Sequence, residues 1–122
     1  MNPTKVLIVE NDFIEARAIE IVVSTIGCAV CGCVASGEEA IEMADKERPD
    51  IVLMDIMLAG AMDGIEAAKE ITRRFSIPII YITGYGQEET KIRAGVSEPY
   101  QYLLKPVDAL YLERAIKAAV GG

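Results

Sequence analysis

Histidine is absent from this chain of 122 residues, and cysteine occurs three times, as Cys28, Cys31 and Cys33. A closed zinc site takes four cysteine or histidine ligands, so the C-x-x-C-x-C spacing does not complete one. An odd number of cysteines without a signal peptide also argues against a disulfide framework. We therefore interpret the cysteines as small apolar residues in and beside a strand.

The sequence also lacks an apolar run long enough to span a membrane, a basic leader, internal repeats and low-complexity stretches. Basic residues are in the minority, with 12 lysines and arginines against 19 acidic residues and a net charge of −7. A nucleic-acid surface needs a basic patch, and this balance disfavours one. These absences predict a cytoplasmic protein whose domain contacts neither membrane nor nucleic acid.

Hydrophobic residues make up 52% of the chain, which is long enough to bury a core without disulfides or metal. Five apolar runs of strand type occupy residues 5–10, 28–35, 50–55, 77–84 and 99–106. Helical patterns follow them at residues 11–27, 36–46, 63–75, 87–95 and 108–120. Strands that are apolar throughout are covered on both faces, as in a parallel sheet. The alternation predicts one α/β domain over 5–120, with a flavodoxin-like, doubly wound five-stranded parallel sheet of order 2-1-3-4-5 and five helices in a three-layer α/β/α sandwich.

Caps and faces of the first two helices follow from the same patterns. Asp12 and Ser36 are predicted N-caps, and Glu39 is placed to complete a capping box with Ser36. Helical spacing predicts that the helix over 11–27 buries one face, made of Ile14, Ala18, Ile21 and Val22.

Polar residues stand at the carboxyl ends of four predicted strands. They are Glu10, Asn11 and Asp12 after the first strand, Asp55 at the end of the third, Thr83 in the fourth and Lys105 in the fifth. In open α/β sheets ligands bind outside the carboxyl ends of the strands, at the point where the strand order reverses. We therefore expect acids, a hydroxyl and an ammonium to converge on one edge of the sheet.

That set of groups suits phosphoryl transfer. Clustered oxygen ligands suit Mg²⁺, which keeps several waters and pairs with phosphate. A carboxylate such as Asp55 can accept a phosphoryl group as an acyl phosphate. Such transfer needs little beyond positioning and neutralisation of charge, which Lys105 and the metal would supply while Thr83 donates to a phosphoryl oxygen.

The motifs "VLIVEND", "VLMDIM" with Asp55, "YITG" with Thr83 and "YLLKP" with Lys105 occur in this order. With "MDGIEAAKEI" after Asp55, the chain resembles the receiver domains of two-component response regulators, and it is similar to the chemotaxis response regulator. The resemblance implies that Asp55 is the phosphorylation site and that Thr83 and Lys105 contact the phosphoryl group. It also implies that Mg²⁺ is held by Glu10, Asn11, Asp55 and the backbone carbonyl of Met57.

The resemblance further implies partners and a switch. The phosphoryl donor would be a phosphohistidine on a sensor histidine kinase or a histidine phosphotransfer protein, and the lack of histidine here excludes a donor within the chain. Beyond taking and slowly losing its own phosphoryl group, the domain would not be an enzyme. Tyr102 matches the aromatic whose rotation accompanies activation, and a downstream protein would read the face of the fourth helix, fifth strand and fifth helix.

Asn11 stands where the family usually has a metal-binding acid, which predicts weak Mg²⁺ binding. It also leaves open a pseudo-receiver, a docking module that works without phosphorylation. A phosphatase of the haloacid dehalogenase type is disfavoured because Met57 stands where a second acid is needed. A flavodoxin is disfavoured because the acidic "ENDF" would repel phosphate, and no P-loop is present.

Overall fold

The computed structural model describes residues 2–58, 60–84 and 102–121. The strands are β1 (Lys5–Val9), β2 (Ala29–Val34), β3 (Ile51–Asp55), β4 (Ile79–Thr83) and β5 (Tyr102–Leu104). The helices within these ranges are α1 (Phe13–Thr25), α2 (Gly37–Glu47), α3 (Gly64–Phe75) and α5 (Ala109–Ala119). The helix predicted over 87–95 lies outside the described residues.

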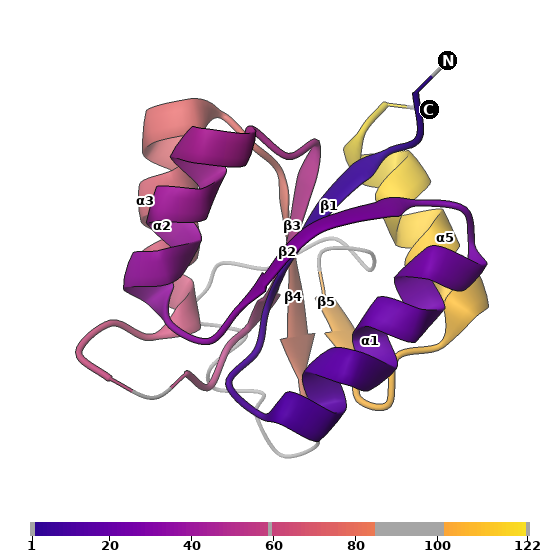
Figure 1. Ribbon diagram of the computed structural model, residues 1–122, viewed down its shortest axis with the longest axis horizontal. Helices are drawn as coiled ribbons and strands as arrows, with labels where there is room; N and C mark the ends of the chain where they lie inside the picture. The colour runs from indigo at the N-terminus through magenta and orange to yellow at the C-terminus, as the bar shows by residue number, and fades with distance from the viewer. Residues whose placement is uncertain (1, 59, 85–101, 122) are drawn as a thin grey trace.

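The five strands form one parallel sheet in the order β2-β1-β3-β4-β5. The predicted fold and strand order are therefore confirmed. Because all strands run the same way, their carboxyl ends meet at one edge, the lower edge in Figure 1. The central strand β3 is buried at every position, which explains its unbroken apolar run up to Asp55.

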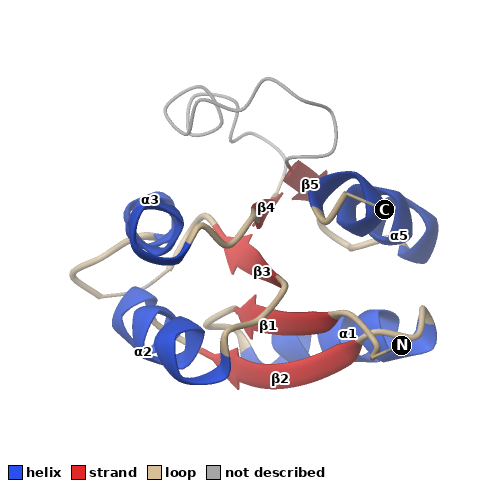
Figure 2. Ribbon diagram, turned by 90° about the horizontal axis from the view of Figure 1, so that it is seen from above, coloured by secondary structure: helices blue, strands red, loops and turns tan. Residues whose placement is uncertain are grey.

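Helices cover both faces of the sheet (Figure 2), with α1 and α5 on one face and α2 and α3 on the other. Between the sheet and α1/α5 lie the buried residues Val6, Ile8, Ile19, Val23, Ile51, Leu53, Ile80, Ile82, Leu103, Leu112, Ala115 and Ile116. The second core, under α2 and α3, includes Leu7, Val9, Val52, Met54, Ile65, Ala68 and Ile71. Successive residues of one strand thus enter opposite cores, as the two-residue period of a strand requires.

The cysteines lie in and beside β2, as predicted, and all three are free thiols. Pairing between β1 and β2 shifts by one residue, from Val6 opposite Val30 to Leu7 opposite Gly32, which leaves Cys31 as the extra residue of a bulge. Burial raises the pKa of all three thiols. Their thiolate forms are therefore disfavoured, which fits the interpretation as small apolar residues.

The predicted buried face of α1 is wrong. Ile14 is 78% exposed and Ile21 is 53% exposed, and Ala18 is also on the surface. The buried residues are instead Ile19 and Val23, with Val22 and Ile26 partly buried beside them. Aliphatic residues occur all around this helix, so spacing alone did not determine the face. Contact with Leu112, Ala115 and Ile116 of α5 and with the sheet determines it.

The caps are close to the prediction. Asp12 caps α1 by accepting from the Glu15 amide at 3.0 Å. Ser36 caps α2 by accepting from the Glu39 amide, while the Glu39 carboxylate accepts from the Ser36 hydroxyl at 3.0 Å. The reciprocal capping box forms instead at α3, between Asp63 and Glu66.

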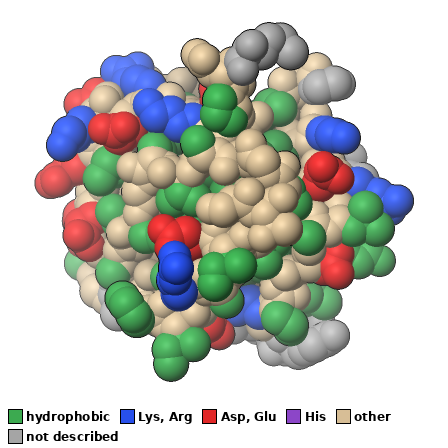
Figure 3. All heavy atoms as spheres, turned by 45° about the vertical axis from the view of Figure 1, so that its right-hand side comes forward, with side chains coloured by type: hydrophobic (Ala, Val, Ile, Leu, Met, Phe, Trp, Pro, Cys, Tyr) green, Lys and Arg blue, Asp and Glu red, His purple; other side chains and the backbone are tan. Residues whose placement is uncertain are grey.

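The surface carries both signs of charge. On the face that Figure 3 shows, acidic and basic side chains are interspersed with hydrophobic ones. Among the described residues, no helix has the length and apolar character needed to cross a membrane.

The observed face of α1 gives a matched pair of substitutions. Ile19→Ala should lower the free energy of unfolding by about 2–5 kcal/mol, because it leaves a cavity against α5. Ile14→Ala, the same change on the exposed side, should alter it by less than about 0.5 kcal/mol. Chemical denaturation of both variants measures the difference. Equal losses would contradict the placement of α1.

Candidate functional site

Four charged side chains meet at the carboxyl edge of the sheet. The Lys105 ammonium lies 2.7 Å from Glu10 Oε1, 2.8 Å from Glu15 Oε2 and 3.3 Å from Asp55 Oδ2. These groups come from the end of β1, the first turn of α1, the end of β3 and the residue after β5. The structure thus brings Glu10, Asp55 and Lys105 together, as the strand ends predict.

The two strand-end carboxylates are buried and held by backbone amides. Glu10 is 4% exposed, and its Oε2 accepts from the Asp12 amide at 3.1 Å. Asp55 is 3% exposed, and its Oδ1 accepts from the Met57 amide at 3.0 Å. Each acid is therefore oriented by the loop that follows its own strand.

Glu15 is the site residue that the sequence reasoning missed. Asp12 fixes the start of α1, and the first helical turn then directs Glu15 toward Lys105. Carboxylate oxygens of Glu10, Glu15 and Asp55 all lie within 4.8 Å of one another. The N-cap was the available signal, since it fixes which residues occupy the turn nearest the strand ends.

The other predicted site residues are Thr83, Asn11 and Tyr102. Thr83 is fully buried at the end of β4, its hydroxyl donates to the Gly84 carbonyl at 3.3 Å, and its carbonyl accepts from the Lys105 amide at 2.9 Å. Asn11 is exposed beside Glu10. Tyr102 is partly buried on β5, opposite Tyr81 of β4.

Burial and charge shift two of these groups. Burial raises the pKa of Glu10, the neighbouring Asp55 carboxyl raises it further, and Lys105 and the Asp12 amide only partly oppose this. Burial lowers the pKa of Lys105, but its contacts with Glu10 and Glu15 and the charge of Asp55 outweigh that effect and hold it above the ordinary value. Lys105 therefore stays protonated at neutral pH, where its ammonium faces the carboxylates of Glu10, Glu15 and Asp55.

This donor set suits a hard divalent cation. Carboxylate oxygens with access to water are the ligands that Mg²⁺ prefers. Glu10 Oε1 is buried and accepts no well-oriented hydrogen bond within the described residues. Its negative charge is compensated by the ion pair with the Lys105 ammonium. A second positive charge would therefore stabilise the site.

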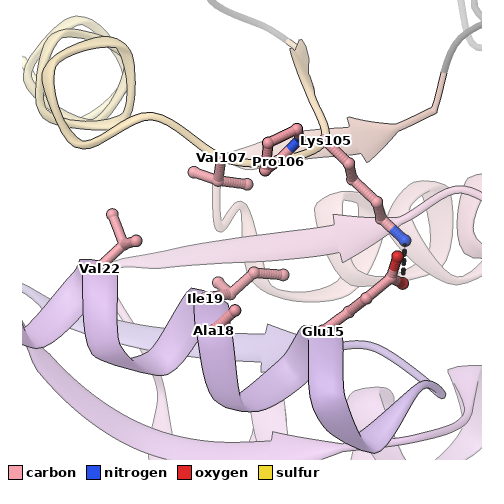
Figure 4. Close-up of a pocket in the computed structure, with 7 residues that line it drawn as sticks. All are labelled: Glu15, Ala18, Ile19, Val22, Lys105, Pro106 and Val107. Carbon is pink, nitrogen blue, oxygen red and sulfur yellow. Dashed lines mark hydrogen bonds and ion pairs between the residues drawn. The ribbon is translucent and has the colours of Figure 1, made fainter.

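A groove of about 360 Å³ adjoins the cluster, between α1 and the residues after β5. Figure 4 shows Lys105 and Glu15 pointing toward each other at one end of it. Its walls are otherwise apolar and consist of Ala18, Ile19, Val22, Pro106 and Val107.

The residues after Asp55 turn back onto its backbone. The Gly64 amide donates to the Ile56 carbonyl at 3.1 Å, and the Asp63–Glu66 capping box fixes the start of α3 at this point. A Cβ on Gly64 would lie 1.9 Å from the Asp55 carbonyl oxygen. The first residue of α3 therefore has to be glycine for the helix to lie this close to the backbone of Asp55.

Comparison with known proteins identifies the family. Residues 6–117 match the model of the response regulator receiver domain. This chain belongs to that family. A receiver is a phospho-acceptor signalling module rather than a true enzyme, and receivers partner with histidine kinases.

Curated relatives and solved structures agree with this family. The transcriptional regulatory protein PdtaR of Mycobacterium tuberculosis (strain CDC 1551 / Oshkosh) is 33% identical over 118 residues, which cover 97% of this chain and 57% of PdtaR. The chain spans about half the length of the curated relatives it matches.

Two solved receiver domains are informative. That of a modulated diguanylate cyclase from Desulfovibrio desulfuricans G20 is 42% identical, with a TM-score of 0.90 and coverage of 98% of this chain and 95% of that one. The receiver domain of the sensor histidine kinase PA1611 from Pseudomonas aeruginosa PAO1 is 28% identical, with a TM-score of 0.78 and coverage of 98% and 99%. In that structure a magnesium ion is coordinated in the active site cleft.

The close approach at Gly64 leads to a stability prediction. Gly64→Ala should lower the free energy of unfolding by about 1–3 kcal/mol, because its methyl group meets backbone that cannot yield. Gly37→Ala is the matched control, since Gly37 is also the first residue of a helix and its added Cβ would meet only side-chain atoms of Met62 and Ala67 at 3.1 Å. Denaturation curves should show the larger loss for Gly64→Ala, and the reverse order would contradict the tight packing at Asp55.

Proposed function

We propose that this protein is a phospho-accepting receiver in a cytoplasmic two-component phosphorelay, with a domain that spans residues 5–120. Asp55 takes a phosphoryl group from a phosphohistidine of a sensor histidine kinase or a histidine phosphotransfer protein. The observation that carries the proposal is the Lys105 ammonium, 3.3 Å from Asp55 Oδ2 at the buried end of β3. A nucleophilic carboxylate and a fixed positive charge are the two protein groups that this transfer requires.

The proposed step forms an acyl phosphate. A carboxylate oxygen of Asp55 bonds to phosphorus, the bond from phosphorus to the donor imidazole nitrogen breaks, and the imidazole leaves with its electron pair and takes a proton. Lys105 neutralises charge on the phosphoryl oxygens, and the Thr83 hydroxyl, at the end of the neighbouring strand β4, donates to one of them.

Mg²⁺ is the proposed cofactor. Glu10, Asp55, the backbone carbonyl of Met57 and the exposed Asn11 would hold it, and the magnesium in the related receiver of Pseudomonas aeruginosa supports this choice. When bound, the ion supplies positive charge to the phosphoryl oxygens. The acidic cluster at Glu10 and Asp55 fits it, and the neutral Asn11 weakens its binding.

Phosphorylation of Asp55 is tested by intact mass. The wild type, treated with acetyl phosphate and Mg²⁺, should gain the mass of one phosphoryl group, and Asp55→Asn should gain none. Asp45→Asn, an exposed acid on α2, is the control that should label like the wild type. If Asp55→Asn is labelled as strongly as the wild type, Asp55 is not the phosphorylation site.

The second candidate function is a pseudo-receiver, which the neutral Asn11 favours. Its signature would be a wild type inert to acetyl phosphate and also to beryllofluoride, a mimic of the phosphoryl group. The buried Asp55 beside Lys105 argues for the phosphorylated form instead.

The proposed output is a switch that joins Thr83 to Tyr102. Thr83 is buried at the end of β4, and Tyr102 lies opposite Tyr81 on the adjacent strand. Movement of Thr83 toward a phosphoryl group would vacate space beside β4, which a large ring can fill. Tyr102 would then turn inward and change the surface that a downstream protein reads on residues 87–95, β5 and α5.

The switch is tested by NMR of free and beryllofluoride-bound protein. Resonances of Tyr102 and of residues 87–95 should shift on binding in the wild type, because beryllofluoride changes the relative populations of two packings of the Tyr102 ring. They should shift much less in Thr83→Ala. Equal shifts in the two proteins would show that Thr83 and Tyr102 are not coupled.

A further inference from the structure

The acidic pocket of this receiver has an unusual source for one of its charges. Position 11, directly after Glu10, is a neutral and exposed asparagine. The third carboxylate in the pocket comes instead from Glu15, one turn into α1, with an oxygen within 4.8 Å of oxygens of Glu10 and Asp55. The pocket therefore contains three carboxylates although residue 11 contributes none.

Glu15 reaches the pocket through specific local contacts. Asp12 caps α1 by accepting from the Glu15 amide, which fixes the backbone of Glu15 in the first turn. Its carboxylate lies 2.8 Å from Lys105, and Figure 4 shows the two side chains directed at each other. The other acid of α1 that forms an ion pair, Glu20, contacts Arg17 outside the pocket.

A separate observation concerns the balance of charge in the pocket. Glu10 is 4% exposed, and its Oε1 accepts no well-oriented hydrogen bond within the described parts of the chain. Lys105 therefore serves Glu10, Glu15 and Asp55 at once, with one positive charge against three negative ones. A divalent cation would leave each carboxylate better neutralised.

We propose that Glu15 supplies, in place of residue 11, the third carboxylate that binds Mg²⁺ at this site. The inference rests on the proposed function, because it concerns the cation of the same phosphorylation site. Glu15 contributes directly or through one of the waters that Mg²⁺ keeps. Its side chain is 45% exposed, so it can exchange its contact with Lys105 for one with the ion.

The test is a calorimetric titration of the full chain with MgCl₂, using four proteins: wild type, Glu15→Gln, Asn11→Asp and the double variant. Glu15→Gln should raise the Kd about tenfold, because a unit charge a few ångströms from a divalent ion is worth about 1–2 kcal/mol even in a wet site. Asn11→Asp should lower the Kd. The double variant should return to within about threefold of the wild type, since its pocket again has three carboxylates.

Glu20→Gln is the matched control, because it removes the same charge from the same helix outside the pocket. It should leave the Kd for Mg²⁺ unchanged within about twofold. Thermal unfolding in the presence of a chelator shows whether each variant is folded, independently of Mg²⁺ binding.

Two results would overturn the inference. One is a Kd for Glu15→Gln equal to that of the wild type, which would show that Glu15 pairs with Lys105 and does not contribute to Mg²⁺ binding. The other is a double variant that binds as weakly as Glu15→Gln, which would show that Glu15 does not replace residue 11.

Labelling of Asp55 by acetyl phosphate separates this inference from the proposed function. If the wild type is labelled and Glu15→Gln binds Mg²⁺ with the Kd of the wild type, only the inference is overturned. Wild type that binds Mg²⁺ through Glu15 but never gains a phosphoryl group would overturn the proposed function alone.

Discussion

The candidate site depends on the ion pairs between the Lys105 ammonium and the carboxylates around it. The ammonium faces three carboxylates, of which Glu10 and Asp55 are almost fully buried. Buried ions carry a large desolvation cost, and like charges at these distances repel each other. Without Lys105, the charged groups that the described residues bring into this cluster would all be negative, so its ammonium stabilises the resting arrangement of the three carboxylates.

The sheet gives this pocket its rigidity. The apolar strands β1 and β3 are buried between two helical layers, so the residues at their ends have little freedom. The start of α3 adds to this, because Gly64 lets the helix lie against the backbone carbonyl of Asp55. Asp55 is thus fixed by its place in β3, by the close approach of α3 and by the Met57 amide, which donates to its carboxylate.

The sequence was informative where a strand end alone determines position. Glu10, Asp55, Thr83 and Lys105 follow apolar runs, so the parallel sheet places them at one edge. It was misleading on α1, which has aliphatic residues on several sides. Helical spacing predicted a buried face with Ile14 and Ile21, whereas packing against α5 and the sheet buries Ile19 and Val23. Glu15 was missed for a related reason: the predicted N-cap Asp12 places it in the first turn of α1, but the position of that turn beside Lys105 depends on tertiary packing.

The presence of Glu15 changes how Asn11 should be understood. Taken alone, a neutral residue beside Glu10 suggests a weakened or abandoned phosphorylation site. The electrostatic field at a bound ion depends on the number of charges in the pocket and on their distances from the ion. It does not depend on the positions of the charged residues in the sequence. Only residues 10–12 separate β1 from α1, so the first turn of the helix lies near the strand ends and brings the Glu15 carboxylate close to Glu10 and Asp55. With Glu15 the pocket contains three carboxylates, and this favours a working receiver over a pseudo-receiver.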